Sequence, residues 1–177
     1  KRWIYEQYDH MVRTGTVVRP GAGDAAVVRL PQTQRGIAMA ADCNGRLCKI
    51  DPYVGGALAV VEAALNVACV GARPQAITDC LNFASPERPE VMWQLSEAID
   101  GMAAACTAFD LPVIGGNVSL YNESSGTNID PTPIVGVVGL VDELTEIPPG
   151  LAWSEGDRLL LLGPAAGSLA GSRWAFD

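Results

Sequence analysis

The chain has 177 residues, of which 49% are apolar, and its 20 acidic and 12 basic residues give a formal charge of −8. This length suffices for one ordinary domain and the beginning of a second, and the apolar fraction suffices for a large core, which excludes a disordered protein. Because the chain has no basic run, its charge argues against sequence-independent binding of nucleic acid. Recognition of phosphate would therefore need a metal ion or backbone amides.

The sequence also argues against a membrane span and a zinc site. No apolar run approaches the roughly 20 residues that cross a bilayer, and the start, Lys1-Arg2-Trp3, lacks the apolar core of a signal peptide. The five cysteines form no Cys-x-x-Cys pair and His10 is the single histidine, so a zinc site lacks ligands. We therefore expect a soluble, cytoplasmic protein whose thiols are reduced and mostly buried.

The first part of the chain predicts a short helix and then a hairpin. Apolar residues recur on one side of a helix over 2–13, which Gly15 ends. Two β-prone runs, 24–30 and 36–43, flank a turn-rich spacer of hairpin length. We expect these two strands to pair antiparallel.

Two long helices and two strands come next. Asp51-Pro52 is typical of a helix start, and the apolar run 57–70 should form a helix buried on most faces. A strand is predicted over 75–83 and an amphipathic helix over 91–109. The run 111–114 should be a buried strand.

The last part of the chain predicts a core strand, a linker and a new unit. A core strand over 134–141 precedes a linker at 148–155, and the apolar run 156–163 is typical of a buried strand that opens another domain. We predict one domain over 1–147 and the start of a truncated second domain over 156–177, in a piece of a larger protein. The fold class is α/β, with a mixed sheet of about five strands and two main helices on one face.

Asp79 is the first candidate functional residue. It lies in or at the end of the otherwise apolar strand 75–83. A buried carboxylate needs a partner, which can be a cation, an amide or a metal ion. A structural cap for a neighbouring loop is an equally weighted alternative.

The segment Gly115-Gly116-Asn117 is the second candidate. Paired glycines let backbone amides approach a phosphate, and the side-chain oxygen of Asn117 suits Mg²⁺. Ser119 would face the same way as Asn117 if the segment were extended. A tight turn without any ligand remains the alternative.

Other polar residues carry weaker signals. Asp42 and Asn44 end one predicted strand and Asp24 begins another, where such residues are more often turn caps, and His10 is expected in solvent. The sequence has no nucleophile beside a base, no Walker-type loop and no Gly-x-Gly-x-x-Gly after a strand. The residues alone therefore indicate an α/β module with a candidate nucleotide or phosphate site.

Several longer segments resemble the synthetase subunit of the phosphoribosylformylglycinamidine synthase family, specifically its second half. The segments span nearly the whole chain in order: Trp3-Ile4-Tyr5-Glu6-Gln7-Tyr8-Asp9, Ala41-Asp42-Cys43-Asn44, Asp51-Pro52-Tyr53, Gly71-Ala72-Arg73-Pro74, Thr78-Asp79-Cys80-Leu81-Asn82-Phe83, Pro86-Glu87 and Gly115-Gly116-Asn117-Val118-Ser119-Leu120-Tyr121-Asn122-Glu123. The last segment is the most specific, because the wider superfamily of aminoimidazole ribonucleotide (AIR) synthetase, selenophosphate synthetase and thiamine-monophosphate kinase usually has Gly-Gly-Asp there.

The resemblance implies an AIR synthetase N-terminal-like domain and an ATP-dependent C–N ligase of purine biosynthesis. In that reaction ATP phosphorylates the formamide oxygen of formylglycinamide ribonucleotide (FGAR), and ammonia from glutamine displaces the phosphate. By position, Asp79 and Gly116 would contact ATP, Asn117 would ligate Mg²⁺ and Ser119 would contact the substrate. No catalytic residue is assigned to this chain, because the family's catalytic histidine belongs to the first half.

The resemblance also implies partners. These are a glutaminase subunit or domain, a small accessory subunit, and a homologous domain that packs on the open face of the sheet. The isolated chain should therefore pair with itself through the sheet, or aggregate.

Departures and alternatives remain. Asn44-Gly45-Arg46-Leu47 stands where the family often has Asn-Pro-Arg-Tyr, and Ala84-Ser85-Pro86 differs from the family's usual loop beyond Asn82. One alternative is another synthetase of the superfamily, such as an AIR or selenophosphate synthetase. The other is a non-catalytic dimerisation module.

Overall fold

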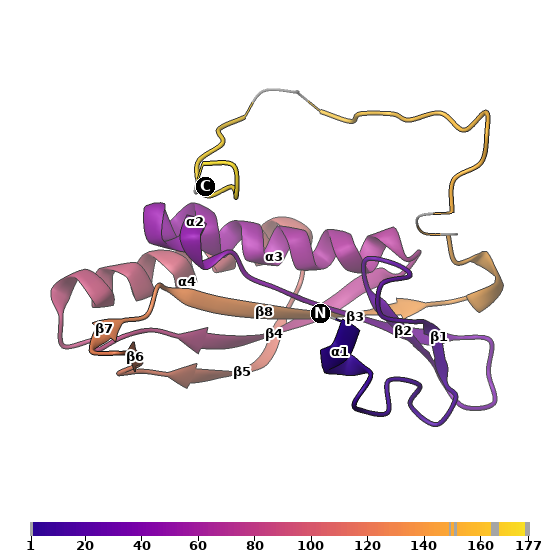
Figure 1. The fold of residues 1–177 in the computed structure, drawn as a ribbon, viewed down its shortest axis with the longest axis horizontal. Coiled ribbons are helices and arrows are strands. Elements are labelled where there is room, and N and C mark those ends of the chain that lie inside the picture. The colour runs from indigo at the N-terminus through magenta and orange to yellow at the C-terminus, as the bar shows by residue number, and fades with distance from the viewer. Residues whose placement is uncertain (1, 149, 151, 164–166, 176–177) are drawn as a thin grey trace.

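The computed structural model describes residues 2–148, 150, 152–163 and 167–175. Its main feature is a six-stranded mixed sheet with α2, α3 and α4 on one face (Figure 1). The strand order is β1-β2-β3-β8-β4-β5, in which β4 and β5 are parallel and all other neighbours antiparallel. The helices are α1 (Arg2–Tyr5), α2 (Gly45–Ile50), α3 (Pro52–Cys69) and α4 (Pro89–Phe109), with a 3₁₀ turn at Leu144–Glu146. The strands are β1 (Thr16–Val18), β2 (Ala26–Arg29), β3 (Gly36–Asp42), β4 (Arg73–Asn82), β5 (Val113–Ser119), β6 (Glu123–Ser124), β7 (Thr127–Asn128) and β8 (Thr132–Val141).

The two long helices form as local signals predict. The Asp51 carboxylate accepts a hydrogen bond from the Val54 backbone N–H at 3.0 Å, and Pro52 occupies the first turn of α3. Helix α4 also begins at a proline, Pro89, and ends at Asp110, whose φ of 53° is left-handed. Both predicted helices are therefore confirmed: α3 begins at the predicted Asp51-Pro52 start, and α4 begins two residues before the expected Val91.

Strand β8 shows which face of the sheet the helices cover. Residues 133, 135, 137, 139 and 141 are buried, whereas the residues between them are half-buried or exposed. Directly paired residues of neighbouring strands share a face, so Ile77, opposite Val137, and Ala38, opposite Gly139, also point toward the helices. The other face of the sheet carries half-buried and exposed apolar residues, such as Met39.

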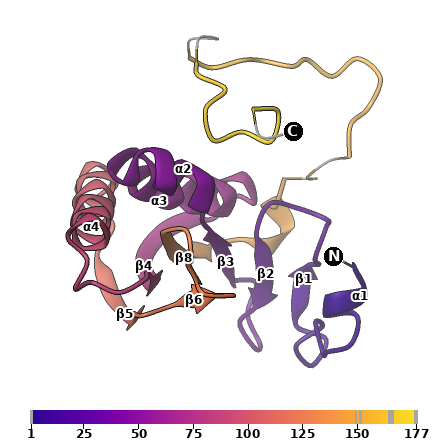
Figure 2. The same ribbon diagram turned by 60° about the vertical axis from the view of Figure 1, so that its left-hand side comes forward.

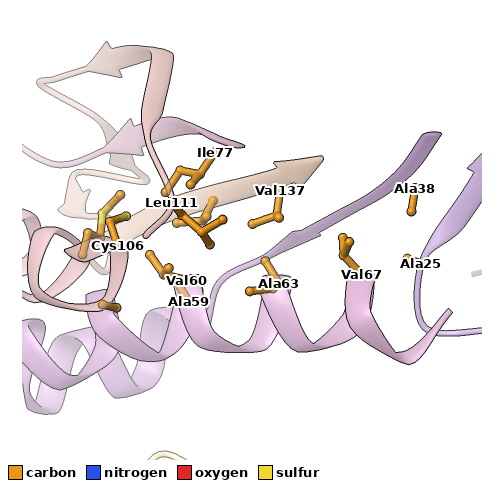
Figure 3. Close-up of a cluster of buried hydrophobic side chains, with 14 of the residues drawn as sticks. Ala25, Ala38, Ala59, Val60, Ala63, Val67, Ile77, Cys106, Leu111 and Val137 are labelled. Atoms are coloured by element: carbon orange, nitrogen blue, oxygen red, sulfur yellow. The ribbon is translucent and has the colours of Figure 1, made fainter. Parts of the chain in front are cut away.

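Small residues let α3 and α4 pack closely on the sheet and on each other. Val60, Ala63 and Val67 of α3 point toward the sheet, where Ile77 and Val137 are fully buried (Figure 3). In α4, a Cβ atom at Gly101 would lie 2.8 Å from the Tyr53 carbonyl carbon of α3. Burial of each larger aliphatic side chain stabilises the fold by about 1.5–3 kcal/mol.

Helix α3 is long and apolar enough to cross a membrane by length and composition alone. A core helix passes the same test, and one such helix is weak evidence for a membrane protein. Eight of its residues are buried, and Val60, Ala63 and Val67 among them belong to the core cluster shared with the sheet. We therefore interpret α3 as a core helix.

The predicted helix over 2–13 is wrong beyond its first turn. Only Arg2–Tyr5 is helical, and Val12 and Arg13 have φ values of 46° and 54°. The Asp9 carboxylate accepts hydrogen bonds from the backbone N–H groups of Met11 and Arg13, which stabilises a turn instead of a helix. The chain then forms β1, a sixth strand that the sequence did not predict, and α1 lies at this edge of the sheet (Figure 2).

Two predicted buried strands are also corrected. Strand β5 forms, but it is the edge of the sheet, and Val113 and Ile114 are 53% and 68% exposed because β5 pairs only with β4. The run 156–163 forms no strand, and Leu159 to Leu162 are exposed, because no other described strand lies beside them. The later stretch 167–175 lies beside α2, where the Asn44 side chain donates to the Gly171 carbonyl at 3.3 Å (Figure 1).

The five cysteines are all free. Cys48 and Cys106 are buried, Cys43 and Cys80 are half-buried, and Cys69 is exposed. The prediction of mostly buried thiols is therefore right for Cys48 and Cys106 and wrong for Cys69. Among the described residues, no group of three or more His, Cys, Asp or Glu side chains could hold a metal ion.

Candidate functional site

The parallel strands β4 and β5 bring the predicted site residues together. Asp79 pairs with Gly116, and Asn82 pairs with Ser119. Residues 115–119 are part of β5, so the alternative of a tight turn at the paired glycines is wrong. These residues lie in the C-terminal halves of β4 and β5, toward the carboxyl ends of the two parallel strands, the end at which ligands bind in open α/β sheets.

The Asp79 carboxylate lies directly over Gly116. A Cβ atom at position 116 would lie 2.6 Å from Asp79 Cγ, so any other residue there would displace the carboxylate. Asp79 shares the helix-covered face with Val135 and accepts a hydrogen bond from the Asn117 backbone N–H. Burial raises the pKa of Asp79, and this hydrogen bond opposes that effect. The partner expected for the partly buried Asp79 carboxylate is therefore the backbone amide of Asn117 on β5.

Asn117 and Ser119 lie on the opposite face from Asp79. The Asn117 side chain is exposed, and its Nδ2 lies 3.9 Å from Sγ of Cys80, which is paired with it across β4 and β5. Ser119 lies two residues further along the same strand, so it faces the same way as Asn117, as predicted. The sheet therefore presents a carboxylate on one face and an amide with a hydroxyl on the other.

A short hairpin, β6 and β7, follows β5 and lies near the ends of β4 and β5 (Figure 2). Asn128 Oδ1 in this hairpin is buried and has no hydrogen-bond partner. Asn82 at the end of β4 donates to the carbonyl oxygens of Cys80, at 2.8 Å, and Thr132, at 3.3 Å. The end of the sheet is therefore rich in amide groups, and this feature was not predicted.

A second polar cluster lies on the helix-covered face, and we call Asp42, Glu62 and Asn66 the acidic cluster. Asn66 Nδ2 donates to Asp42 at 3.3 Å, and the Asp42 and Glu62 carboxyl groups share a hydrogen bond. Partial burial, followed by the Asp42 charge, raises the pKa of Glu62. Asp42 therefore accepts a hydrogen bond from a side chain of α3, whereas the sequence favoured a role as a turn cap.

Glu62 and Asn66 were not predicted from the sequence. Their signal is a polar pair four residues apart in an otherwise apolar helix, which places both side chains on one face. Asp42 and Asp79 both pair with Val135 from opposite sides, so the acidic cluster and Asp79 occupy one row across the sheet. Asn44, by contrast, caps α2 by accepting from the Leu47 N–H at 3.2 Å, as expected of a cap.

Comparison with known proteins identifies the fold. Residues 22–141, more than half of the chain, match the family described as AIR synthase related protein, N-terminal domain. The chain belongs to this family. It is 51% identical over 174 residues to phosphoribosylformylglycinamidine synthase subunit PurL of Caldanaerobacter subterraneus subsp. tengcongensis. That match covers 98% of this chain and 24% of the relative, so the chain spans about a quarter of the curated relative's length.

Solved structures agree with this assignment. The PurLQS structure from Thermotoga maritima has a TM-score of 0.75 and 40% identity, covering 82% of this chain and 24% of that one. T. maritima PurL complexed with ATP has a TM-score of 0.71 and 38% identity, and T. maritima PurL complexed with FGAR has a TM-score of 0.72 and 40% identity. These two matches cover 82% of this chain and 24% and 23% of those chains. The AIR synthetase-like fold and the resemblance to phosphoribosylformylglycinamidine synthase are confirmed.

Proposed function

We propose that this chain is part of a phosphoribosylformylglycinamidine synthase, which converts FGAR, ATP and ammonia from glutamine to the amidine in purine biosynthesis. The observation that carries the proposal is the 51% identity to a PurL subunit over 98% of the chain. The proposal is also supported by the pairing of β4 with β5, which brings the predicted ATP, metal and substrate residues onto neighbouring strands, with Asp79 on one face and Asn117 and Ser119 on the other. The enzyme is an ATP-dependent C–N ligase, and this chain contributes part of its site.

Asp79 and Gly116 form the nucleotide-binding part of the site. Gly116 leaves room for the Asp79 carboxylate, which in turn holds the Asn117 backbone amide. The carboxylate therefore orients the strand that carries Asn117 and Ser119, and it can accept hydrogen bonds from a nucleotide. The T. maritima PurL that was solved in complex with ATP supports a nucleotide for this family.

Mg²⁺ is the proposed metal, since it neutralises phosphate charge and polarises the transferred group when bound. Asn117 supplies one exposed amide oxygen, and Asp79 lies on the other face. The acidic cluster contains two carboxylates and an amide, the oxygen donors that Mg²⁺ prefers. We propose Asn117 as a ligand of the ion, and the acidic cluster, which lies on the opposite, helix-covered face, as a separate candidate donor set.

Ser119 contacts the substrate in this proposal. Its hydroxyl lies at the end of β5 on the open face and can donate to an oxygen of FGAR. The reaction centre is completed by parts of the enzyme beyond this chain, including the glutaminase that supplies ammonia and a small accessory subunit. The T. maritima relative solved as PurLQS supports such an assembly. We place the enzyme in the cytoplasm.

A non-catalytic dimerisation module is the second candidate, and one observation favours it. The open face of the sheet carries Met39, Ile134 and other apolar side chains that no helix in the described part of the chain covers. Apolar sheet faces are good pairing surfaces. Both functions can coexist, because a pairing face and a site at the strand ends use different residues.

Turnover by the full-length synthetase tests the proposal. Purified full-length enzyme should release ADP and phosphate only when FGAR and ammonia are both present. The 177-residue chain alone should give no FGAR-dependent phosphate release, because it contains only part of the site. Full-length enzyme that consumes ATP without any FGAR dependence would contradict the proposed reaction.

A further inference from the structure

The side chain of Asn122 holds Ser119 in place. Asn122 Nδ2 lies 2.9 Å from the Ser119 carbonyl oxygen, 3.0 Å from Ser119 Oγ and 3.1 Å from the Phe83 carbonyl oxygen. Ser119 Oγ lies 3.2 Å from Asn122 Oδ1 and can donate to it. An amide nitrogen has two hydrogens, so these three oxygens compete for it. The Asn122 side chain therefore connects the end of β5 to the end of β4. Its amide can both donate to the Ser119 hydroxyl and accept from it.

The backbone between the two residues forms a strained corner. Tyr121 has a φ of 60°, a left-handed conformation that a bulky residue adopts only when its surroundings impose it. Three backbone hydrogen bonds impose it here. Phe83 N–H donates to the Ser119 carbonyl at 3.0 Å, Tyr121 N–H to the Ala84 carbonyl at 3.1 Å, and Asn122 N–H to the Phe83 carbonyl at 3.1 Å. This corner turns the chain back, so that the Asn122 side chain faces Ser119.

We propose that Asn122 is a positioning residue for the substrate contact of Ser119, an inference that rests on the proposed function. Without substrate, the Ser119 hydroxyl donates to Asn122 Oδ1. When substrate binds, the hydroxyl turns to a substrate oxygen, and Asn122 Nδ2 donates to Ser119 Oγ and keeps it in place. Linked hydrogen bonds polarise one another, so an Oγ atom that accepts from Nδ2 is a better donor to the substrate.

Steady-state kinetics of the full-length synthetase, with ammonia as nitrogen donor, test this role. Ser119→Ala and Asn122→Ala should each raise the KM for FGAR by about tenfold, the effect expected of one lost hydrogen bond. The KM for ATP should change less than about twofold, and kcat should persist, because a contact made equally in ground and transition states changes only KM. The double variant should be no worse than either single variant, since both remove the same contact.

Thr127→Ala provides the matched control. Thr127 is an exposed residue of the neighbouring hairpin and lies outside the proposed site. This variant should leave both KM values unchanged. If Asn122→Ala does not fold, Asn122→Asp replaces it, because aspartate keeps the shape and the acceptor but lacks the N–H donors, and the same criteria apply.

Four outcomes would overturn the inference. An unchanged FGAR KM in Asn122→Ala, with a raised one in Ser119→Ala, would leave the proposed function standing and exclude a positioning role. Additive effects would show that Asn122 acts independently of Ser119. A lower Tm with both KM values raised would assign Asn122 a structural role alone. An unchanged FGAR KM in Ser119→Ala would instead reject the substrate contact of the proposed function, and the inference with it.

Discussion

The Asp79 carboxylate fills the space that a side chain at Gly116 would occupy on the neighbouring parallel strand. The two residues are 37 positions apart in the chain, and α4 connects their strands. This contact explains a requirement for glycine at 116 without any left-handed backbone, because Gly116 has no positive φ. Position 115 differs, since a Cβ atom there would meet nothing within 4 Å.

Gly116→Ala should therefore impair the enzyme much more than Gly115→Ala. The added methyl group must displace Asp79, which overpacks the site and should cost about 1–3 kcal/mol of stability. In the full-length synthetase the KM for ATP should also rise. Urea unfolding and ATP titrations measure both effects. Equal behaviour of the two variants would contradict the contact between Asp79 and Gly116.

Asp79→Asn separates a nucleotide contact from a structural cap. The amide oxygen of asparagine can still accept from the Asn117 N–H, and it avoids burying a charge. We therefore expect Tm to stay within a few degrees of the wild type while ATP-dependent turnover falls at least about tenfold. If Asp79 is only a structural cap, both stability and turnover should instead be retained, because asparagine keeps the same hydrogen bond. Thermal unfolding and kinetics on the same preparation decide between these outcomes.

Asn117→Ala and Glu62→Gln compare the two donor sets proposed for Mg²⁺. If Asn117 is a ligand, its replacement should raise the Mg²⁺ concentration needed for half-maximal turnover and barely change Tm, since the side chain is exposed. Glu62→Gln should have a comparable effect only if the acidic cluster also binds the ion. Mg²⁺ titrations of turnover with both variants measure this. Parallel loss of stability and activity in Asn117→Ala would favour a structural role.

The isolated chain should form a twofold dimer through the open face of its sheet. Met39 is 41% exposed on this face and pairs with Val138, so Met39→Glu should place a charge in the interface and give monomers. Leu65→Glu is the control, because Leu65 is 55% exposed on α3, which covers the other face. Light scattering at high micromolar concentration measures the mass. A monomeric wild-type chain would contradict the pairing.

Local rules in the sequence predicted much of the fold. The Asp51-Pro52 start of α3, the antiparallel pairing of β2 with β3 and the two long helices follow from capping, alternation and helical periodicity. Each of these rules involves only a few residues that are close in the sequence, so they can be applied without knowledge of the tertiary contacts. They failed at 2–13, where the Asp9 side chain captures backbone N–H groups and competes with the helix that the apolar pattern indicates.

The sequence by itself also determined the candidate residues Asp79, Gly116, Asn117 and Ser119, since their types and the family resemblance point to them. Only the tertiary structure decided that Asp79 lies on one face of the sheet while Asn117 and Ser119 lie on the other. The reason is that the register between β4 and β5 joins residues 37 positions apart, and no local rule specifies it. The same holds for the acidic cluster, which requires α3 to cross the end of β3, and for Asn122, whose contact with Ser119 depends on the backbone of Phe83 and Ala84.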